Sequence, residues 1–573
     1  MDSIRRAARP QQAIGGLLIA AAFMLFFRLG ATDLWAPDEP RFAAVAEELR
    51  SFEHGSTGLV VLHLNGAPYT QKPPLYYWMA ALFGAVPGRV TELAARLPSA
   101  LAGVGCIWLT LQFGTALTRS PVAGMISGAV LLTVFRFAHM ARRAQLDIVL
   151  TFFVLLALYA LFQLDRQVDL RRRRVENPNG AEGERSRWFY ALHIALGLAL
   201  LTKGPVALLP IPAFALYLAW QGKLRNFRQV FPARSFAISL GPAVAWLALA
   251  TAMAPSGFFD QAIVQNVFAR FFSGTAHVRS FSYFFIHFPL EFLPWSLLWP
   301  WVGIQVWRTA TRESISAGRN GTRLLIVWVG LCFAFFSLSA GKRGLYLLPT
   351  YPAVAILCGA AIDEFLVRRN QLPRVVWATL AGVAIAALGF GAFVWGNGGA
   401  ALPSYPGFAL PAAFGSILLV IATFSLAASL LLMARRASPL VQLSAPLAGI
   451  YLLEVLVFAV AYPAFDDEKS PRPISRAAAV LSESGSPIGV FDHPALAGGI
   501  AYYSGHPVVN LRSEQSLRDF LDSGGRNIIV KQTKVAQVPR VAKFEVRAHS
   551  RSGERKLVVI SPSGTQPPPV AVR

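Results

Sequence analysis

The sequence predicts a polytopic α-helical membrane protein that carries a small α/β domain at its C-terminal end. Of the 573 residues, 54% are hydrophobic and only 14% are charged, whereas about 25% of the residues of a soluble protein are charged. Apolar runs of roughly 18–25 residues recur along most of the chain, and a run of that length can cross a bilayer as a helix. From about residue 465 the composition becomes mixed and polar.

The apolar runs predict about thirteen transmembrane helices. They lie near 12–31, 95–118, 121–138, 147–164, 188–202, 205–220, 235–254, 283–307, 324–339, 345–365, 375–396, 408–433 and 444–463. The apolar segment 73–87 is short and bracketed by prolines, so we expect an interfacial or re-entrant helix there, within a long first outer loop of residues 32–94. The odd number of spans places the two termini on opposite sides of the membrane.

The net charge of +23 is concentrated in short connections between spans. The arginines in these connections are Arg171–Arg174, Arg225/Arg228/Arg234, Arg308/Arg312/Arg319, Arg368/Arg369 and Arg435/Arg436. With the N-terminus inside, all of them fall on the cytoplasmic side, as the positive-inside rule requires. This distribution argues against a nucleic-acid partner and indicates contact with membrane lipids. The N-terminal arginines resemble a signal peptide, but the many later spans favour an uncleaved first helix.

The chain therefore divides into a transmembrane domain, residues 1–464, and an outer α/β domain, residues 465–573. A helix is expected near 513–522, and the predicted strands are Pro487–Phe491, Ile500–Tyr503, Val508–Leu511, Asn527–Val530 and Lys556–Ile560. The three cysteines lie in apolar spans and indicate neither disulfides nor a metal site. No fingerprint of a nucleotide-binding fold is present, so we expect no nucleotide cofactor.

Two carboxylates follow the first span directly, at Asp38 and Glu39, with Arg41 beside them. Ionisable groups at the mouth of a span are costly unless they face water or a polar cavity, so they are candidates for function. The predicted topology places Asp147, at the start of the fourth span, on the same face. Asp147 could simply be an acid favoured by the helix dipole. Two converging carboxylates are what acid–base catalysis or binding of a charged sugar would need.

Lysines are rare, at 9 against 44 arginines (53 basic residues in all). The predicted topology nevertheless places Lys72, Lys203 and Lys342 at the outer face, which indicates a need for ammonium groups there. The alternative is snorkelling at the interface, and Lys203 fits a tight turn equally well.

Arg343 and Tyr346 follow Lys342 and could donate with it to anionic oxygens at headgroup depth. The alternative for this group is an interfacial anchor belt. Cations at that depth suit a lipid phosphate. Because no nucleotide site is visible, an activated donor would have to be a lipid.

A further outer loop, residues 255–282, contains Arg270 and His277. A lone histidine is more often a structural hydrogen-bonding group than a metal ligand. We keep His277 as a candidate ligand for a divalent ion.

The order of these motifs resembles the bacterial aminoarabinose transferase (ArnT) family, within the protein O-mannosyltransferase-like GT-C glycosyltransferases. The resemblance covers the membrane domain, including its span count, and the outer C-terminal domain. The motifs that carry it are Leu34-Trp35-Ala-Pro-Asp38-Glu39-Pro-Arg41-Phe42, Tyr69-Thr-Gln71-Lys72-Pro73-Pro74, Arg143-Ala-Gln-Leu-Asp147, Thr202-Lys203-Gly204-Pro205, Arg270 with His277, and Lys342-Arg343 through Pro349.

The resemblance implies an enzyme of the bacterial inner membrane that transfers a sugar from a polyprenyl-phosphate donor at the periplasmic face. In aminoarabinose transferases the donor is undecaprenyl phosphate-4-amino-4-deoxy-L-arabinose and the acceptor is a lipid A phosphate. Asp38 and Asp147 match the catalytic aspartates, and Lys72 and Arg270 match groups that hold the donor phosphate. Arg41, Tyr69 and Tyr346 match active-site positions. We add Tyr346 and Lys342 to the donor-phosphate group, and we expect the substrate-binding residues to be Glu39, Arg41, Tyr69 and Arg343.

Two departures from the family pattern are visible. Pro40 and Phe42 stand where the family often has threonine and tyrosine, so a hydroxyl is lost at residue 42. Gln71 stands where enterobacterial-type members have an acid, which weakens the case for a metal shared with the loop histidine. Two alternatives stay open: the same chemistry on a protein or glycan acceptor, and a flippase of lipid-linked sugars. A flippase would need ionisable groups at mid-span, where Glu454 is one of few.

Overall fold

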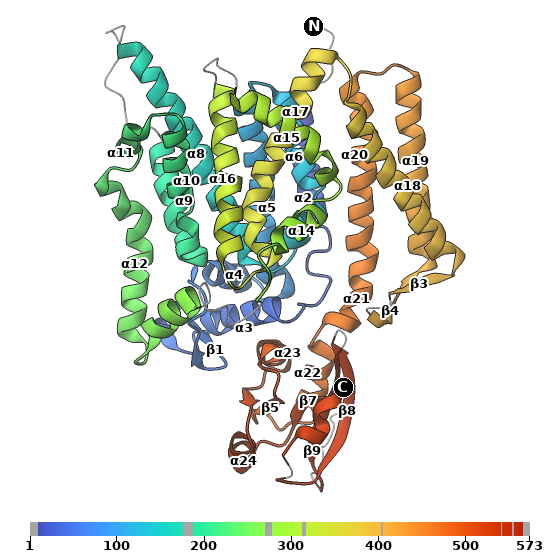
Figure 1. Ribbon diagram of the computed structural model, residues 1–573. Helices are drawn as coiled ribbons and strands as arrows, with labels where there is room; N and C mark the ends of the chain where they lie inside the picture. The colour runs from blue at the N-terminus through green and yellow to red at the C-terminus, as the bar shows by residue number, and fades with distance from the viewer. Residues whose placement is uncertain are drawn as a thin grey trace.

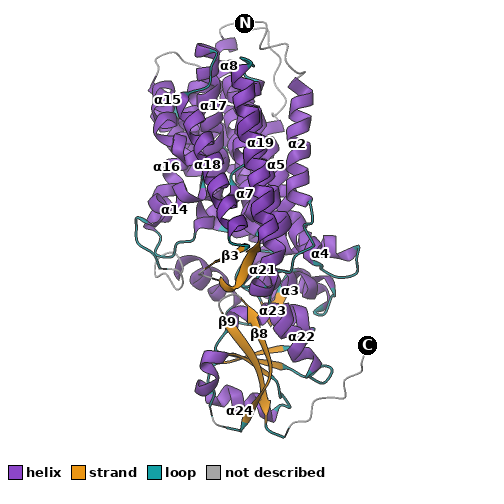
Figure 2. Cartoon of the chain, turned by 90° about the vertical axis from the view of Figure 1, so that its right-hand side faces the viewer, coloured by secondary structure: helices purple, strands orange, loops and turns teal. Residues whose placement is uncertain are grey.

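Residues 10–175, 187–269, 278–311, 317–402, 405–539, 541–552 and 555–564 are described by the computed structural model of this chain. The helices run side by side in a bundle, and a small sheet domain hangs below one end of it (Figures 1 and 2).

The bundle contains long helices separated by short turns. Its helices are α2 (Pro10–Phe26), α5 (Glu92–Thr118), α6 (Pro121–Leu132), α7 (Phe135–Ala141), α8 (Leu146–Val175), α9 (Arg187–Lys203), α10 (Pro210–Trp220), α11 (Phe227–Val230), α12 (Phe236–Met253), α14 (Tyr283–Glu291), α15 (Trp299–Thr311), α16 (Ala317–Leu338), α17 (Tyr351–Arg369), α18 (Arg374–Gly396), α19 (Ala412–Ala434), α20 (Pro439–Leu456) and α21 (Tyr462–Lys469). A hairpin of β3 (Gly399–Leu402) and β4 (Tyr405–Pro411) joins α18 to α19.

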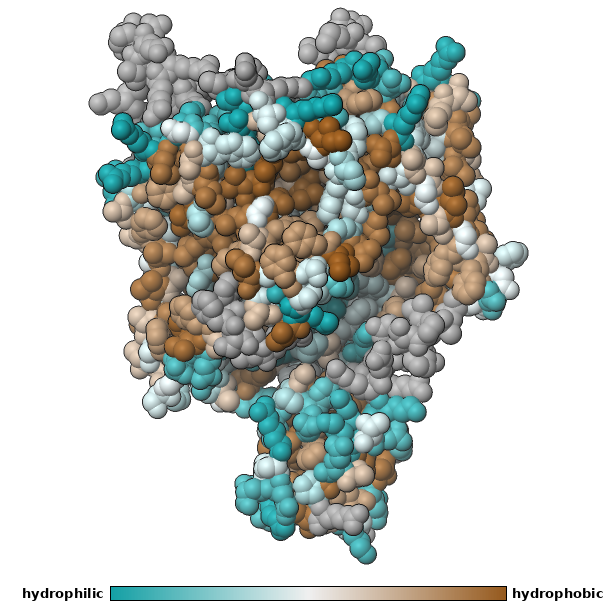
Figure 3. Space-filling model, viewed as in Figure 1, coloured by the Kyte–Doolittle hydropathy of each residue, from teal (hydrophilic) through white to brown (hydrophobic). Residues whose placement is uncertain are grey.

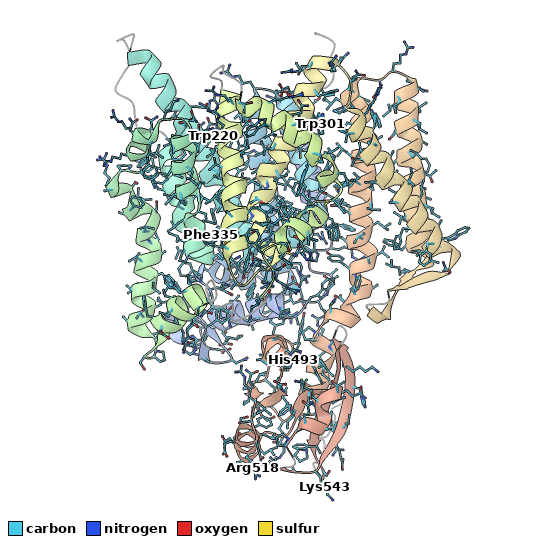
Figure 4. The ribbon with its side chains drawn as sticks, in the orientation of Figure 1. Trp220, Trp301, Phe335, His493, Arg518 and Lys543 are labelled. Carbon is cyan, nitrogen blue, oxygen red and sulfur yellow. The ribbon has the colours of Figure 1, made fainter. Side chains whose placement is uncertain are left out.

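The fold class predicted from the sequence is confirmed. In the described part of the chain, eight helices are long and apolar enough to cross a membrane, or nine if the bent pair α6–α7 is one span. Each of the thirteen predicted spans coincides with a helix or with consecutive helical segments, several of them shorter than a full span. The surface shows the expected apolar band between two hydrophilic ends (Figure 3). Trp220 and Trp301 lie toward the end away from the sheet domain (Figure 4), as interfacial tryptophans do.

Local sequence explains where the central helices begin and how closely they pack. Thr91 caps α5 by accepting a hydrogen bond from the Ala94 amide, and Ser120 caps α6 ahead of Pro121. Gly359 of α17 lies against the backbone of α6, where a Cβ atom would collide with Ser127 and Ala123. Small residues at such crossings let helix backbones approach closely in a membrane.

Three predicted spans are interrupted, two of them at a proline. The span at 283–307 breaks between α14 and α15, where Pro294 cannot donate to a continuous hydrogen-bond ladder. The span at 345–365 begins as a 3-10 helix, η7 (Gly344–Thr350), which contains Pro349. The span at 121–138 is bent by 72° between α6 and α7.

The first outer loop folds into short elements beneath the bundle. These are α3 (Asp38–Arg50), the two-residue strands β1 (His63–Leu64) and β2 (Ala67–Pro68), and α4 (Leu75–Ala85). With 11 residues, α4 is too short to span a bilayer, which agrees with the expected interfacial segment. It packs against α3 and α5.

The C-terminal domain is built around a mixed five-stranded sheet. Its elements are α22 (Arg472–Val480), β5 (Ile488–Phe491), α23 (Ala497–Ser504), β6 (Val508–Leu511), α24 (Glu514–Asp522), β7 (Ile528–Lys531), β8 (Phe544–Ser552) and β9 (Arg555–Pro562). The strand order is β6-β5-β7-β9-β8, with β5, β6 and β7 parallel and β9 antiparallel to β7 and β8.

Most of the predicted elements of this domain are confirmed, and one is wrong. The segment Ile500–Tyr503 was expected to be a strand but lies within helix α23. Its β-branched and aromatic residues favoured a strand. In the structure, Ile500 lies on the buried face of the helix, in the core of the outer domain. The helix ends at Gly505, which adopts a left-handed conformation (φ 70°). Strand β8 was not predicted from the sequence.

The C-terminal domain docks directly on the loop that carries Asp38. Arg472 pairs with both Asp33 and Glu92 and stacks on the ring of Tyr503 at 4.7 Å. The Leu34 amide donates to the Tyr503 hydroxyl at 2.7 Å. The extended segment that leads into Asp38 is therefore held in place by residues of the C-terminal domain.

We expect Arg472→Ala to loosen this docking by about 1–2 kcal/mol, because partly exposed charge-assisted hydrogen bonds are worth about that much. The measurement is thermal unfolding in detergent together with limited proteolysis near residue 470. The matched control is Arg518→Ala, which breaks the exposed Arg518–Glu514 pair on α24 and should change neither. Equal behaviour of the two variants would contradict the docking role.

Candidate active site

Asp38 is the first residue of α3 and is 6% exposed. Arg41 donates from Nη2 to its Oδ1 at 2.6 Å, and Arg343 donates from Nη2 to its Oδ2 at 2.9 Å. Burial by itself would raise the pKa of Asp38, but the guanidinium groups of Arg343 and Arg41 outweigh burial and hold the pKa below its usual range. Asp38 is therefore an oriented, ionised carboxylate at neutral pH.

Arg343 binds Asp38 and lies within electrostatic reach of Asp147. It precedes η7, its side chain is 36% exposed, and it has donors left beyond the one that binds Asp38. The charge of Asp147 also acts on its guanidinium, and with Asp38 it raises the pKa of Arg343 despite burial. The expected convergence of Asp38 and Asp147 on one face is thus present around Arg343.

Asp147 lies at the start of α8 and is 5% exposed. Its Oδ1 forms an ion pair with Lys203, the last residue of α9. The Lys203 ammonium lies 5.0 Å from the centroid of the Tyr346 ring, a cation–π distance. Lys203, for which a simple turn was an equal alternative, thus lies within the site between Asp147 and Tyr346.

Glu39 is fully buried, unlike its neighbour Asp38. Its carboxylate accepts hydrogen bonds from Arg96 Nε at 2.9 Å and from the amides of Trp35 and Ala144 at 2.9 and 2.8 Å. Arg143 lies 3.3 Å away. Burial would raise the pKa of Glu39, but Arg96 and Arg143 lower it to about 2. The structure favours a supporting role for Glu39 over the predicted contact with substrate.

Tyr69 reaches the site region from the connection between β2 and α4, which also carries Lys72. The Tyr77 hydroxyl donates to the Tyr69 hydroxyl at 3.3 Å, and both tyrosines act electrostatically on Arg41. Lys72 is half-buried, two residues beyond Thr70. Asn266 donates from Nδ2 to the Thr70 carbonyl at 3.3 Å, which ties the later outer loop to this connection.

Lys342 is buried and directs its ammonium toward the chain itself. It donates to the carbonyl oxygens of Ser339 and Arg279, the latter at 3.2 Å. These bonds shape the turn between α16 and η7 and so position Arg343. This favours a supporting role for Lys342 over the predicted contact with the donor phosphate.

Arg270 and His277 lie outside the described residues, so their predicted roles stay predictions. Of the positions considered for a metal, only Gln71 is described, and a neutral amide is a poorer ligand than the acid it replaces. Within the described residues, Glu48, Glu53 and His54 have a spacing that could hold a metal. Two amides, of Asn65 and Gly66, already bond the Glu48 carboxylate. We derive no catalytic step through a metal.

Sequence reasoning did not single out the groups that support Asp38. Arg96 lies inside an apolar span and binds the carbonyls of Leu29, Thr32 and Asp33 as well as Glu39. A lone arginine within a predicted span is a detectable signal, because such a charge needs a partner. The partner itself, 57 residues earlier in the sequence, was not deducible.

Comparisons with known proteins show which proteins the chain resembles. Residues 16–254 match the model of the family described as dolichyl-phosphate-mannose-protein mannosyltransferase. The chain is 30% identical to the undecaprenyl phosphate-alpha-4-amino-4-deoxy-L-arabinose arabinosyl transferase 1 of Pseudomonas fluorescens, over 66% of this chain and 63% of that protein. It is 29% identical to the corresponding transferase of Pseudomonas aeruginosa strain LESB58, over 66% of each. The chain thus spans a little under two thirds of the length of the first of these relatives.

Solved structures share the fold over nearly the whole chain. The crystal structure of ArnT from Cupriavidus metallidurans bound to undecaprenyl phosphate superposes with a TM-score of 0.73 at 22% identity, covering 96% of this chain and 98% of that one. The archaeal oligosaccharyltransferase AglB from Archaeoglobus fulgidus matches with a TM-score of 0.53 at 12% identity, covering 92% of this chain and 69% of that one.

The helical bundle with its outer sheet domain therefore has the fold of these solved glycosyltransferases. By sequence, the chain is similar to the protein mannosyltransferase family over residues 16–254 and to the bacterial aminoarabinose transferases over about two thirds of its length.

We expect Glu39→Gln to destabilise the protein by about 3–5 kcal/mol, because it leaves the buried guanidinium of Arg96 without its counter-charge. With its pKa lowered from 4.5 to about 2, the carboxylate stabilises the fold fully above pH 4.5. That contribution is lost as the pH falls toward 2. Thermal unfolding in detergent across this range measures both effects. Asp38→Asn, whose partners are more exposed, should cost much less, and equal losses would contradict the supporting role of Glu39.

Proposed function

We propose that the protein is an inverting glycosyltransferase that moves 4-amino-4-deoxy-L-arabinose from undecaprenyl phosphate to a phosphate of lipid A. The observation that carries the proposal is the grouping of Asp38 and Asp147 at one mouth of the bundle. Arg343 donates to Asp38, and its carbonyl accepts a hydrogen bond from the amide of Tyr346. The ring of Tyr346 lies against Lys203, which pairs with Asp147. The names of the curated relatives supply the sugar and the lipid carrier. The arginine-rich connections, under the positive-inside rule, support an active site on the periplasmic face of the inner membrane.

The proposed reaction is a displacement at the anomeric carbon of the sugar. An acceptor oxygen forms the new bond to that carbon as the bond to the lipid phosphate breaks, and the phosphate leaves with the electron pair. Asp38 and Asp147 orient the acceptor and stabilise positive charge, either on the sugar ring or on the ammonium of the aminopentose. Lys72, Arg270 and Tyr346 are the groups proposed to stabilise the departing phosphate.

The electrostatics of Asp38 favour a phosphate over a hydroxyl as the acceptor. A hydroxyl needs a general base, and a carboxylate whose pKa is held below its usual range is a weak one. A phosphate is already anionic and needs no strong base. The second candidate, a protein hydroxyl acceptor, is favoured by the description of the matching family model.

Substituting Asp38 or Lys72 with alanine should reduce sugar transfer by about a hundredfold or more, since one charged group that acts in the transition state contributes roughly 3 kcal/mol. The assay is the mass spectrum of lipid A from a deletion strain complemented with each variant. A phosphate-linked aminopentose should appear with the parent protein only. Lipid A unchanged by the parent protein would point to the protein or glycan acceptor. Near-parent activity of both variants would overturn the site assignment.

The pH dependence of transfer tests the pairing of Asp38 with Arg343. Arg343→Gln removes the cation that lowers the pKa of Asp38, so burial then dominates and the pKa rises. Because the ionised form is the active one, we expect activity to be lost at a higher pH than in the parent during acidification. The measurement is kcat/KM between pH 4 and pH 8. An acid limb at the same pH in both proteins would contradict the pairing.

A further inference from the structure

The region around Asp38 contains more cations than its carboxylates can neutralise. Most of these cations are bound to the chain itself. Arg142 donates to the carbonyl of Phe27 at 2.8 Å and also to that of Met24, while Arg96 is bound to Glu39 and to three carbonyls. Such groups hold segments together and have little capacity left for a ligand. Arg136 differs from them because its guanidinium donates no hydrogen bond to the described residues; an unpaired buried Nε, by contrast, is common to Arg136 and Arg142.

Arg136, on α7, is poorly paired. Its nearest carboxylate is Glu291 of α14, and the distance from Nη2 to Oε1 is 3.6 Å, beyond ordinary hydrogen-bond length. Its Nε is buried and has no hydrogen-bond partner. The side chain is nevertheless 29% exposed. A guanidinium group has five N–H donors, and buried donors are normally hydrogen-bonded. Arg136 can therefore donate hydrogen bonds to a ligand.

Arg136 lies close to the site from a different side than Arg41. Glu291, its neighbour, packs on Gly344 where a Cβ atom would collide with the carboxylate, and Gly344 follows Arg343 directly. The Tyr351 hydroxyl donates to Glu291 at 3.0 Å and holds it there. The charges of both Asp38 and Arg136 act on Arg143. Arg136 and Arg343 thus border the same part of the site from α7 and from the turn before η7.

Access to this side from the membrane is consistent with the surface. Figure 3 shows a hollow between the main body of the bundle and helices α18–α20, with hydrophilic side chains near its lower end. The aromatic residues Phe135 and Phe458 stack at 5.7 Å and connect α7 to the stretch after α20. A lipid whose chains stay in the bilayer could present a polar head at this level.

We propose that Arg136, together with Arg343, binds an anionic phosphate monoester of the lipid acceptor on the α7–α14 side of Asp38. The inference rests on the proposed function and specifies how its acceptor is held. Lys72, on the connection between β2 and α4, is the residue proposed above to bind the phosphate of the donor. Arg136 then makes the enzyme selective for phosphorylated acceptors. An acceptor without the phosphate cannot accept the charge-assisted hydrogen bonds from this arginine and therefore binds more weakly.

The test measures steady-state transfer by the full-length protein in detergent, with lipid A carrying or lacking its phosphate monoesters as acceptor. We expect Arg136→Gln to raise the KM for phosphorylated lipid A about 10- to 100-fold, as the loss of one such bond predicts. The KM for the donor should stay within about twofold, since Lys72 is intact. Direct binding of lipid A to the protein, without donor, should weaken by the same factor.

Glu291→Gln is the matched control, because it removes the only carboxylate paired with Arg136 in the described part of the chain and leaves the arginine in place. It should leave the acceptor KM at or below the parent value, whereas a purely structural Arg136–Glu291 pair would make both variants fail alike. Arg136→Lys should restore part of the affinity. An unchanged acceptor KM in Arg136→Gln, or an equal rise in the donor KM, would overturn the inference. If the parent protein made no product but bound phosphorylated lipid A through Arg136, the proposed function would fail and the binding site would stand.

Discussion

The buried carboxylate of Glu39 is the interaction on which the rest of the site depends. It joins the segment before α3 through the Trp35 amide, α5 through Arg96, and the turn before α8 through the Ala144 amide. A charge removed from water is tolerated only where hydrogen bonds and opposite charges surround it. Because Glu39 is fixed in this way, the backbone of the preceding residue, Asp38, is also held in place. Asp38 is thereby held at the helix end with its oxygens toward Arg41 and Arg343.

The architecture followed from the sequence because hydrophobic length and arginine position are strong, additive signals in membrane proteins. The breaks within the spans were harder to predict from the sequence. Pro294 and Pro300 are visible in the sequence, but whether a proline bends, breaks or is tolerated in a membrane helix depends on its neighbours. The strand assigned to Ile500–Tyr503 failed for a related reason, because burial against the sheet, and not local propensity, decided that segment.

The site followed from the sequence in part. The predicted topology alone placed Asp38, Asp147 and Arg343 at the same end of the bundle. Polar groups at one end of a compact helical bundle lie close to one another. Sidedness does not reveal which of two adjacent acids is inside the protein. Asp38 and Glu39 have the same chemistry and neighbouring positions, yet one is 6% and the other 0% exposed. Only the packing of α3 against α5 and the turn after α7 separates the two roles.

The docking of the C-terminal domain has a consequence for how such proteins can vary. The Leu34 amide and the Tyr503 hydroxyl that accepts its hydrogen bond are 469 residues apart in the chain. At Gly498 of α23 there is no room for a side chain, because the backbone of Arg41 lies in the way. Segments 33–41 and 466–503 therefore depend on each other for their packing. A chimera that exchanged the outer domain of this protein for that of a homologue would keep its catalytic loop in register only if both segments came from the same parent.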